Sequence, residues 1–260
     1  MDLETLCGKM EETVRRAGAY VRTAVPQAID EKSGHSDLVT EYDVQTQRML
    51  MEELSALYPE AEFMGEEEHL QADVTVGDCF VIDPIDGTAN FVAGYNRSAV
   101  SVALLRDGQP VLGMVYHPWA EEFFSAIKGK GAFLNGRKLT LSDRPLADSL
   151  VGFGSCPYYR DLAQRTTRIL GAVLDVAPDI RRMGSAALDL CDIAAGRTGA
   201  FFELKLSPWD YAAAGLIAQE AGAKVFDLQG EPLGFSNPSP VVAGAPSAAE
   251  ELRTLINKTK

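Results

Sequence analysis

The sequence is poor in the residues that build zinc sites, disulfides and nucleophile–histidine pairs. It has four cysteines and three histidines among 260 residues, and no two cysteines form a C-x-x-C pair. We therefore interpret the cysteines as reduced and mostly buried small residues, in preference to a disulfide or a structural zinc site. The histidines fit no recognisable triad or metal pattern, and we assign them to the surface or to packing.

The chain also lacks an excess of positive charge and any long apolar run. Its 24 basic residues stand against 37 acidic ones, a formal net charge of -13, which argues against direct nucleic-acid binding because that needs a basic face. No apolar run approaches the ~20 residues that span a bilayer. The opening Met1-Asp2-Leu3-Glu4 has neither the basic start nor the apolar core of a signal peptide. We expect a cytoplasmic protein with no membrane partner and no direct nucleic-acid partner.

A pair of carboxylates follows a short apolar segment in the first half of the chain. Residues 79–82 favour a β-strand, which Pro84 would end. Asp83 and Asp86 flank this proline on a bent backbone, and Gly87-Thr88 adds main-chain N–H groups beside them. Facing carboxylates repel unless a cation lies between them, and oxygen-only ligands favour Mg²⁺, Mn²⁺ or Ca²⁺ over zinc. An isolated segment of this kind is more often a solvated turn that caps a helix.

Four further acidic positions have ordinary local explanations. Glu66 lies in a run of three glutamates, which most often forms a solvated surface. Asp43 and Asp210 each stand near the start of an expected helix, where an N-cap accounts for an aspartate. Glu203 is the one charge in the apolar segment 200–204, and it faces water if that strand lies at a sheet edge; otherwise it must accept hydrogen bonds.

The hydrophobic pattern predicts a mixed α/β (α+β) protein. Helical spacing covers residues 2 to about 24 and again Asp43 to Tyr58, and alternating segments joined by glycine turns predict an antiparallel meander from Ala99 to Gly136. Strands and helices then alternate. The expected strands are 150–153, 200–204, 224–226 and 240–243, and the expected helices are 160–174, 184–196, 208–221 and one from about Ser247.

No internal repeat, low-complexity tract or flexible linker divides the sequence. We therefore expect a single unit, 1–260, made of approximate halves 1–145 and 146–260 that meet at the site. The first half would carry Glu66, Asp83 and Asp86, and the second would carry Glu203 and Asp210.

Several of these segments occur in the order and at roughly the separations found in the inositol monophosphatase family of metal-dependent, lithium-sensitive phosphatases. The chain resembles that family, and its bacterial branch, over nearly its whole length. The segments that carry the resemblance are Gly65-Glu66-Glu67, Asp83-Pro84-Ile85-Asp86-Gly87-Thr88, Gly184-Ser185-Ala186-Ala187 and Trp209-Asp210. The resemblance implies the layered α-β-α-β-α sandwich of the inositol monophosphatase and fructose-1,6-bisphosphatase type. It also implies a homodimer, which would cover the long apolar meander.

The resemblance implies a site for two or three Mg²⁺ ions, with Mn²⁺ as a substitute and Li⁺ and Ca²⁺ as inhibitors. Glu66, Asp83 and the carbonyl of Ile85 would hold the first ion, and a third ion would lie near Glu66. Asp83, Asp86 and Asp210 would hold the second. The implied catalytic residues are Glu66, Thr88 and Asp43: Asp43 would hydrogen-bond Thr88, and Thr88 with Glu66 would position the attacking water.

The substrate contacts implied by the resemblance involve both halves of the chain. They are Asp86, Gly87, Thr88, Ser185, Ala186 and Glu203, with Lys32 and Asp37 as lower-ranked candidates. Glu203 would accept hydrogen bonds from inositol hydroxyls. We thus expect an inositol-phosphate phosphatase acting on inositol monophosphate or a related small sugar or polyol phosphate.

Alternatives stay open at this point. Fructose-1,6-bisphosphatase, histidinol-phosphatase and 3′-phosphoadenosine nucleotide phosphatase activities use the same kind of metal site. A role from another class is a regulatory protein-binding partner with little turnover.

Overall fold

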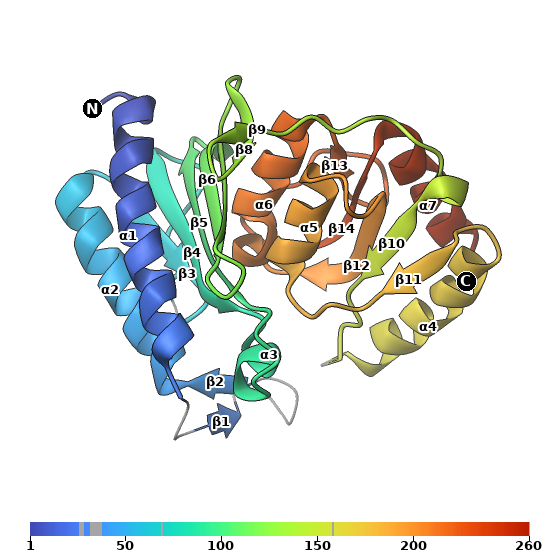
Figure 1. The fold of residues 1–260 in the computed structure, drawn as a ribbon, viewed down its shortest axis with the longest axis horizontal. Coiled ribbons are helices and arrows are strands. Elements are labelled where there is room, and N and C mark those ends of the chain that lie inside the picture. Colours follow the sequence, from blue (N-terminus) through green and yellow to red (C-terminus); the bar gives the residue numbers. More distant parts are fainter. Residues whose placement is uncertain (26–28, 32–37, 69, 158, 260) are drawn as a thin grey trace.

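The structure is a computed structural model that describes residues 1–25, 29–31, 38–68, 70–157 and 159–259. Helices and sheets alternate in layers (Figure 1): α1 and α2, a seven-stranded sheet, α5 and α6, a five-stranded sheet, then α4 and α7. This order confirms the expected α-β-α-β-α fold. The helices are α1 (Leu3–Thr23), α2 (Glu41–Leu57), α3 (Thr88–Val92), α4 (Arg160–Leu174), α5 (Ala186–Ala194), α6 (Pro208–Ala221) and α7 (Pro246–Lys258).

The seven-stranded sheet contains the expected meander as strands β5 to β8. Neighbouring strands are antiparallel except β3 and β4, which run parallel. The segment 128–130 forms the turn between β7 and β8, as its glycines predict. In sheet order, the strands are β3 (Glu62–Gly65), β4 (Asp78–Asp86), β5 (Ala99–Arg106), β6 (Gln109–His117), β7 (Glu122–Ile127), β8 (Gly131–Leu134) and β9 (Arg137–Lys138).

The five-stranded sheet places β12 at its centre. β12 pairs with β10 in parallel and with β14 antiparallel. An edge position for Glu203, one of the two explanations open from the sequence, is therefore wrong. In sheet order, the strands are β11 (Asp179–Arg181), β10 (Leu150–Phe153), β12 (Ala200–Leu206), β14 (Ser239–Gly244) and β13 (Lys224–Phe226). The remaining elements are the strand pair β1 (Ile29–Glu31) and β2 (Leu38–Thr40) and the 3-10 turn at Leu146–Asp148.

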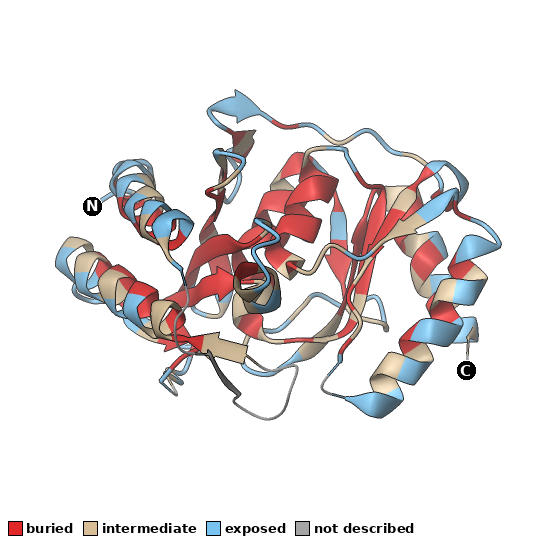
Figure 2. Cartoon of the chain, turned by 60° about the horizontal axis from the view of Figure 1, so that its bottom comes forward, coloured by how far each residue is buried: buried red, intermediate tan, exposed pale blue. Residues whose placement is uncertain are grey.

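The outer helices are amphipathic, as the helical spacing predicts. Leu6, Met10 and Val14 of α1 are buried on the seven-stranded sheet, and Asp2 caps the helix by accepting a hydrogen bond from the Thr5 N–H at 2.8 Å. Figure 2 shows the opposite faces of the outer helices exposed. The helices of the described ranges include none that is both long and apolar enough to cross a bilayer.

Helix α6 is buried on nearly all sides because both sheets pack against it. Ten of its residues are buried, which fits an apolar sequence with no polar face. A Cβ at Gly113 of β6 would lie only 2.6 Å from the Ala213 carbonyl oxygen, so this glycine permits the close approach of the helix. The meander thus has α6 on one face and α1 on the other, where α2 extends the cover over β4. Its apolar faces need no cover from a second copy of the chain.

Candidate active site

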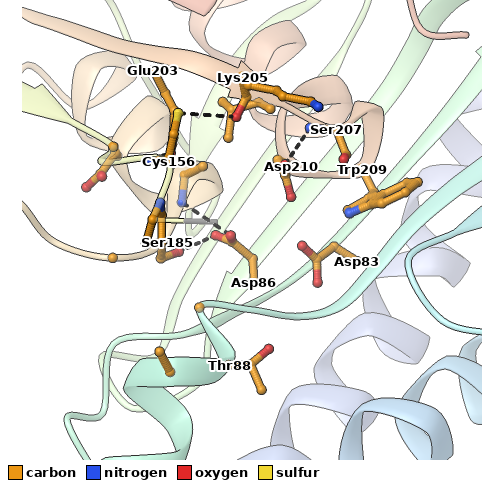
Figure 3. Close-up of a pocket in the computed structure, with 18 of the residues that line it drawn as sticks. Asp83, Asp86, Thr88, Cys156, Ser185, Glu203, Lys205, Ser207, Trp209 and Asp210 are labelled. Atoms are coloured by element: carbon orange, nitrogen blue, oxygen red, sulfur yellow. Dashed lines mark hydrogen bonds between the residues drawn. The ribbon is translucent and has the colours of Figure 1, made fainter. Parts of the chain in front are cut away.

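A pocket of about 460 Å³ lies where the end of β4, the N-termini of α5 and α6, and β12 meet. Acidic side chains dominate its wall. Figure 3 shows Asp83, Asp86 and Asp210 directed toward one another, with Thr88 on one side of them and Glu203 on the other. The acidic residues of the lining are Glu66, Asp83, Asp86, Asp189, Glu203 and Asp210.

Three carboxylates form a compact group in this pocket. One oxygen each of Asp83, Asp86 and Asp210 can be chosen so that all three lie within 4.8 Å of one another, and Asp83 is only 1% exposed. Glu66 lines the same pocket. The structure therefore brings together every carboxylate that the resemblance implied as a metal ligand.

A β-bulge in β4 explains how Asp83 and Asp86 share one side of the strand. Their partners on β5 are Ser101 and Ala99, so two residues of β4, Pro84 and Ile85, lie opposite one residue of β5. Residues three apart would face opposite sides of a regular strand, whereas a bulge re-aims one of them. Proline favours such a place because it cannot donate a ladder hydrogen bond. Pro84 therefore bends the strand without ending it, contrary to our expectation.

The N-terminus of α5 holds the carboxylate of Asp86. The Asp86 carboxylate accepts hydrogen bonds from the Ser185 hydroxyl, from the Ala186 N–H at 3.2 Å and from the Ala187 N–H at 2.9 Å. Ser185 and Ala186 also line the pocket, as expected for substrate contacts. In this structure, however, their donors orient Asp86.

Burial and mutual repulsion disfavour ionisation of these acids. Burial raises the pKa of Asp83 well above its usual value, and the charges of Glu66, Asp86 and Asp210 raise it further. Burial and then Asp86 and Glu66 raise the pKa of Asp210, against the hydrogen bond from the Ser207 N–H. A cation bound among these acids would favour their ionised form. Their ligand atoms are all oxygens, which fits a hard divalent ion such as Mg²⁺.

Asp43 and Asp210 occupy equivalent positions at their helices. Each is the third residue of its helix and accepts a hydrogen bond from the N-cap residue, the Thr40 N–H at 2.8 Å for Asp43 and the Ser207 N–H at 2.7 Å for Asp210. The simple N-cap explanation for both aspartates is therefore wrong, because Thr40 and Ser207 are the caps. This arrangement leaves Asp210 facing the pocket from a fixed helix end.

Thr88 links the pocket to Asp43. Its hydroxyl lies 3.2 Å from the Asp43 carboxylate and 3.2 Å from the Ile85 carbonyl oxygen, so it can donate to one of them and keep a lone pair for a further partner. The hydrogen bond implied by the resemblance is thus present. Burial, countered by hydrogen bonds from Thr40, raises the pKa of Asp43 to about 6.

The three consecutive glutamates separate into three environments. Glu66 lines the pocket, Glu67 is buried, and Glu68 is exposed and forms an ion pair with Arg48. The main chain of Glu67 is fixed by Gln47, whose side-chain amide accepts from its N–H at 3.0 Å and donates to its carbonyl at 2.8 Å. The solvated-run explanation therefore holds only for Glu68.

Glu203 lines the pocket from the central strand β12. Its carboxylate accepts a hydrogen bond from the Cys156 N–H at 3.3 Å, and burial raises its pKa to about 7 despite the opposing charge of Arg182. A Cβ at Gly154 would lie 1.8 Å from the Glu203 carboxylate, so this glycine makes room for it. Glu203 thus satisfies the second explanation, a carboxylate that accepts hydrogen bonds.

Other parts of the lining were not anticipated. Gly154, Cys156, Arg182 and Lys205 all line the pocket. Lys205 had a usable signal, since residues two apart on a strand share a face and Glu203 had already been singled out. The four cysteines are free, and Cys156 and two others are buried. Lys32 and Asp37, the lower-ranked candidates, lie outside the described residues.

The layered α/β fold and an acidic pocket between its two sheets that could hold a cation define the class of protein. Comparison with known proteins gives the family: the inositol monophosphatase family model matches residues 2–260, and the chain belongs to that family.

Named relatives carry two kinds of description. The chain is 32% identical to the inositol-1-monophosphatase of Bacillus subtilis over 90% of this chain and 89% of the relative. It is 38% identical to the Nus factor SuhB of Xylella fastidiosa over 75% of this chain and 70% of the relative. The solved structure of the extragenic suppressor protein suhB from Bartonella henselae is similar with a TM-score of 0.90 at 32% identity, covering 98% of this chain and 100% of that one. Family membership supports a phosphatase.

Proposed function

We propose that this protein is a Mg²⁺-dependent phosphomonoesterase that hydrolyses inositol monophosphate or a related small sugar or polyol phosphate. The observation that carries the proposal is the group of Asp83, Asp86 and Asp210, whose ligand oxygens lie within 4.8 Å of one another. Together with Glu66 and the carbonyl of Ile85, these residues would hold two or three ions. Mn²⁺ would substitute, and Li⁺ and Ca²⁺ would inhibit.

The pocket offers water, and not a side chain, as the nucleophile. Burial raises the pKa of the Cys156 thiol to about 12, so it stays protonated at neutral pH. The Ser185 hydroxyl is committed to Asp86. Among the described lining residues there is no histidine to activate either group.

Thr88, Asp43 and Glu66 are placed to prepare that water. The Asp43 carboxylate accepts a hydrogen bond from the Thr88 hydroxyl, which leaves a lone pair of the Thr88 oxygen free to accept from the water. Glu66, on the same wall, supplies a second acceptor for the water. Two acceptors fix the water's protons and direct a lone pair at phosphorus.

Bound divalent cations would neutralise charge on the phosphoryl oxygens and stabilise the departing alkoxide. The main-chain N–H groups of Gly87 and Thr88 would bind the phosphoryl group beside Asp86. Glu203 would accept hydrogen bonds from substrate hydroxyls, which favours a polyol over a simple alkyl group because an unmatched buried acceptor penalises the wrong substrate.

A phosphate-release assay tests the proposal directly. Purified protein is assayed with inositol 1-phosphate, fructose 1,6-bisphosphate, histidinol phosphate and 3′-phosphoadenosine 5′-phosphate, with Mg²⁺ and with EDTA. We expect Mg²⁺-dependent turnover that EDTA abolishes and fresh Mg²⁺ restores. Turnover that survives complete chelation would contradict the metal site.

A protein-binding role is the second candidate, favoured by the 38% identity to a relative named as a Nus factor. The full set of pocket carboxylates favours the enzyme. Absence of turnover on every phosphate of the panel, with Mn²⁺ still bound, would favour the second candidate. We further propose a cytoplasmic homodimer, which now rests on the family resemblance alone because helices already cover the meander; light scattering at micromolar concentration tests the dimer.

A further inference from the structure

Two basic side chains, Arg182 and Lys205, line the pocket but have no role in the proposed hydrolysis. Among the described lining residues, Arg182 and Lys205 are the basic ones, against six acidic ones. The chain has 37 acidic and only 24 basic residues, so most basic side chains could find a carboxylate to form an ion pair with. Within the described part of the chain, however, neither cation forms an ion pair.

Lys205 lines the pocket beside a second β-bulge, in β12. Glu203 pairs with Val241 and Leu206 with Ser239, so Leu204 and Lys205 lie opposite Pro240 alone. Successive residues of a regular strand face opposite sides, yet Lys205 and Leu206 both line the pocket. Lys205 stands two residues after Glu203 and shares its face, so this wall carries a cation beside its carboxylate. The bulge adds Leu206 to the same wall.

The close contacts of both side chains are with neutral groups, although the charge of Arg182 also opposes the rise in the pKa of Asp86, Asp189 and Glu203. The Lys205 ammonium lies 3.8 Å from the centroid of the Tyr159 ring, a cation–π contact that orients the side chain and leaves its charge uncancelled. The Arg182 Nε donates to the Ser155 hydroxyl at 3.3 Å, and its Nη1 lies beside Gly184, 3.0 Å from where a Cβ would stand there. Charges oriented in this way remain available to an anionic ligand.

We propose that Lys205, assisted by Arg182, binds a second acidic group of the substrate, a phosphate or a carboxylate. This inference rests on the proposed phosphatase function and names the class of phosphate ester that the pocket prefers. The phosphoryl group to be cleaved would lie at Asp83, Asp86 and Asp210, and the second acidic group would lie toward Lys205 on the β12 side; Figure 3 shows these side chains. A volume of about 460 Å³ accommodates a phosphorylated polyol with such a group.

Matched substrate pairs test the proposal. One pair is glycerol 2-phosphate and 2-phosphoglycerate, which differ by one carboxylate. The other is fructose 1-phosphate and fructose 1,6-bisphosphate, which differ by one phosphate. We expect the wild-type protein to prefer the more acidic member of at least one pair, and the pair that responds identifies the acidic group.

Lys205→Met keeps most of the side-chain length and removes the charge. It should lower kcat/KM for the more acidic member about 10- to 100-fold more than for its partner, mainly through KM, because one charge-assisted hydrogen bond is lost. Lys205→Arg should restore most of the preference. Lys138→Met, on the exposed strand β9, is the control and should leave kcat/KM unchanged for both members of each pair.

Equal losses on both members of each pair would overturn the proposal and make Lys205 a packing residue on Tyr159. Wild-type preference for the less acidic member of both pairs would also overturn it. Failure of the phosphatase proposal looks different, since none of the four esters would then release phosphate with Mg²⁺. Should Lys205→Met fail to fold, Arg182→Gln, at an exposed side chain, applies the same ratio test.

Discussion

The strands β4 and β12 reach the same pocket from different sheets, and both change register there by one residue. In β4 the bulge gathers two carboxylates, Asp83 and Asp86, on one side of the strand. In β12 it adds Leu206 to the wall that already carries Glu203 and Lys205. Proline is present at both bulges, as Pro84 in β4 itself and as Pro240 in the strand facing β12.

The two walls differ in chemistry although the backbone device is the same. The β4 wall offers carboxylates and suits a cation, whatever the rest of the substrate is. The β12 wall offers one acid, one ammonium and an aromatic neighbour, which suits the organic part of a substrate. We therefore expect that mutations in the β4 wall lower the rate on every substrate, and that mutations in the β12 wall change the choice of substrate.

The largest effect should come from Asp210→Asn, which removes one ligand charge opposite the β4 wall and keeps the shape of the side chain. We expect kcat to fall about 10²- to 10⁴-fold, since bound cations contribute several kcal/mol to the transition state. The ratio of kcat/KM between inositol 1-phosphate and glycerol 2-phosphate should stay unchanged. Asp161→Asn, at an exposed position of α4, is the control. Wild-type kinetics in Asp210→Asn would reduce Asp210 to a helix-capping residue.

The next effect concerns Thr88, which joins the β4 wall to Asp43. Thr88→Ala removes the hydroxyl that would position water, and we expect a loss of about 10²- to 10³-fold in kcat on every substrate. Thr88→Ser should retain most of the activity because it keeps the donor to Asp43. Equal activity of the alanine and serine variants, measured by phosphate release, would exclude the hydroxyl from the reaction.

A smaller and more selective effect is expected at Glu203. Glu203→Ala should lower kcat/KM for inositol 1-phosphate about 10- to 100-fold more than for glycerol 2-phosphate or p-nitrophenyl phosphate, because simple esters offer fewer hydroxyls. The affinity for Mg²⁺ should stay nearly unchanged. An equal loss on all three esters would place Glu203 in the support of the metal site.

The smallest effect should appear in the pH dependence of stability without metal. Burial raises the folded-state pKa of Glu203 from 4.5 to about 7. Between these values the folded protein binds more protons than the unfolded chain, so its contribution to stability rises as pH falls from 7 toward 4.5. Glu203→Gln should remove this part of the dependence, which calorimetry in EDTA would show as a loss of about 5–10 °C from the pH-dependent change in Tm. A Tm difference between the two proteins that does not vary with pH would contradict it.

The element pattern could be predicted from the sequence to a large extent. Helices α4 and α6 and strands β10 and β13 begin and end where periodicity and turn residues placed them. Apolar periodicity, proline and glycine determine helices, strands and turns through neighbouring residues, so these elements can be predicted from the sequence alone. Strands β3 and β11 were missed because three or four residues at a sheet margin show no clear alternation.

The site could be predicted only in part. Asp83 and Asp86 stood out as a pair of carboxylates after an apolar strand, whereas Glu66 and Asp210 had ordinary local explanations and entered the site only through the resemblance to the family. The sequence did not reveal that Asp83 and Asp86 lie on the same side of β4. This depends on a register shift against β5, which is visible only once the strands are paired. Lys205 could have been predicted, since it stands two residues after Glu203 on the same strand. Leu206 could not, because its place on the wall depends on the bulge opposite Pro240, in a strand distant in the sequence.

Cation binding by the two walls tests the central claim most directly. Mn²⁺ binding can be followed by electron paramagnetic resonance in the wild-type protein and in the Asp83→Asn and Glu203→Gln variants, without any substrate. The account predicts a weakened or lost Mn²⁺ site in Asp83→Asn and wild-type binding in Glu203→Gln. Equal Mn²⁺ affinity in both variants, or a greater loss in Glu203→Gln, would contradict the division between a cation wall on β4 and a substrate wall on β12.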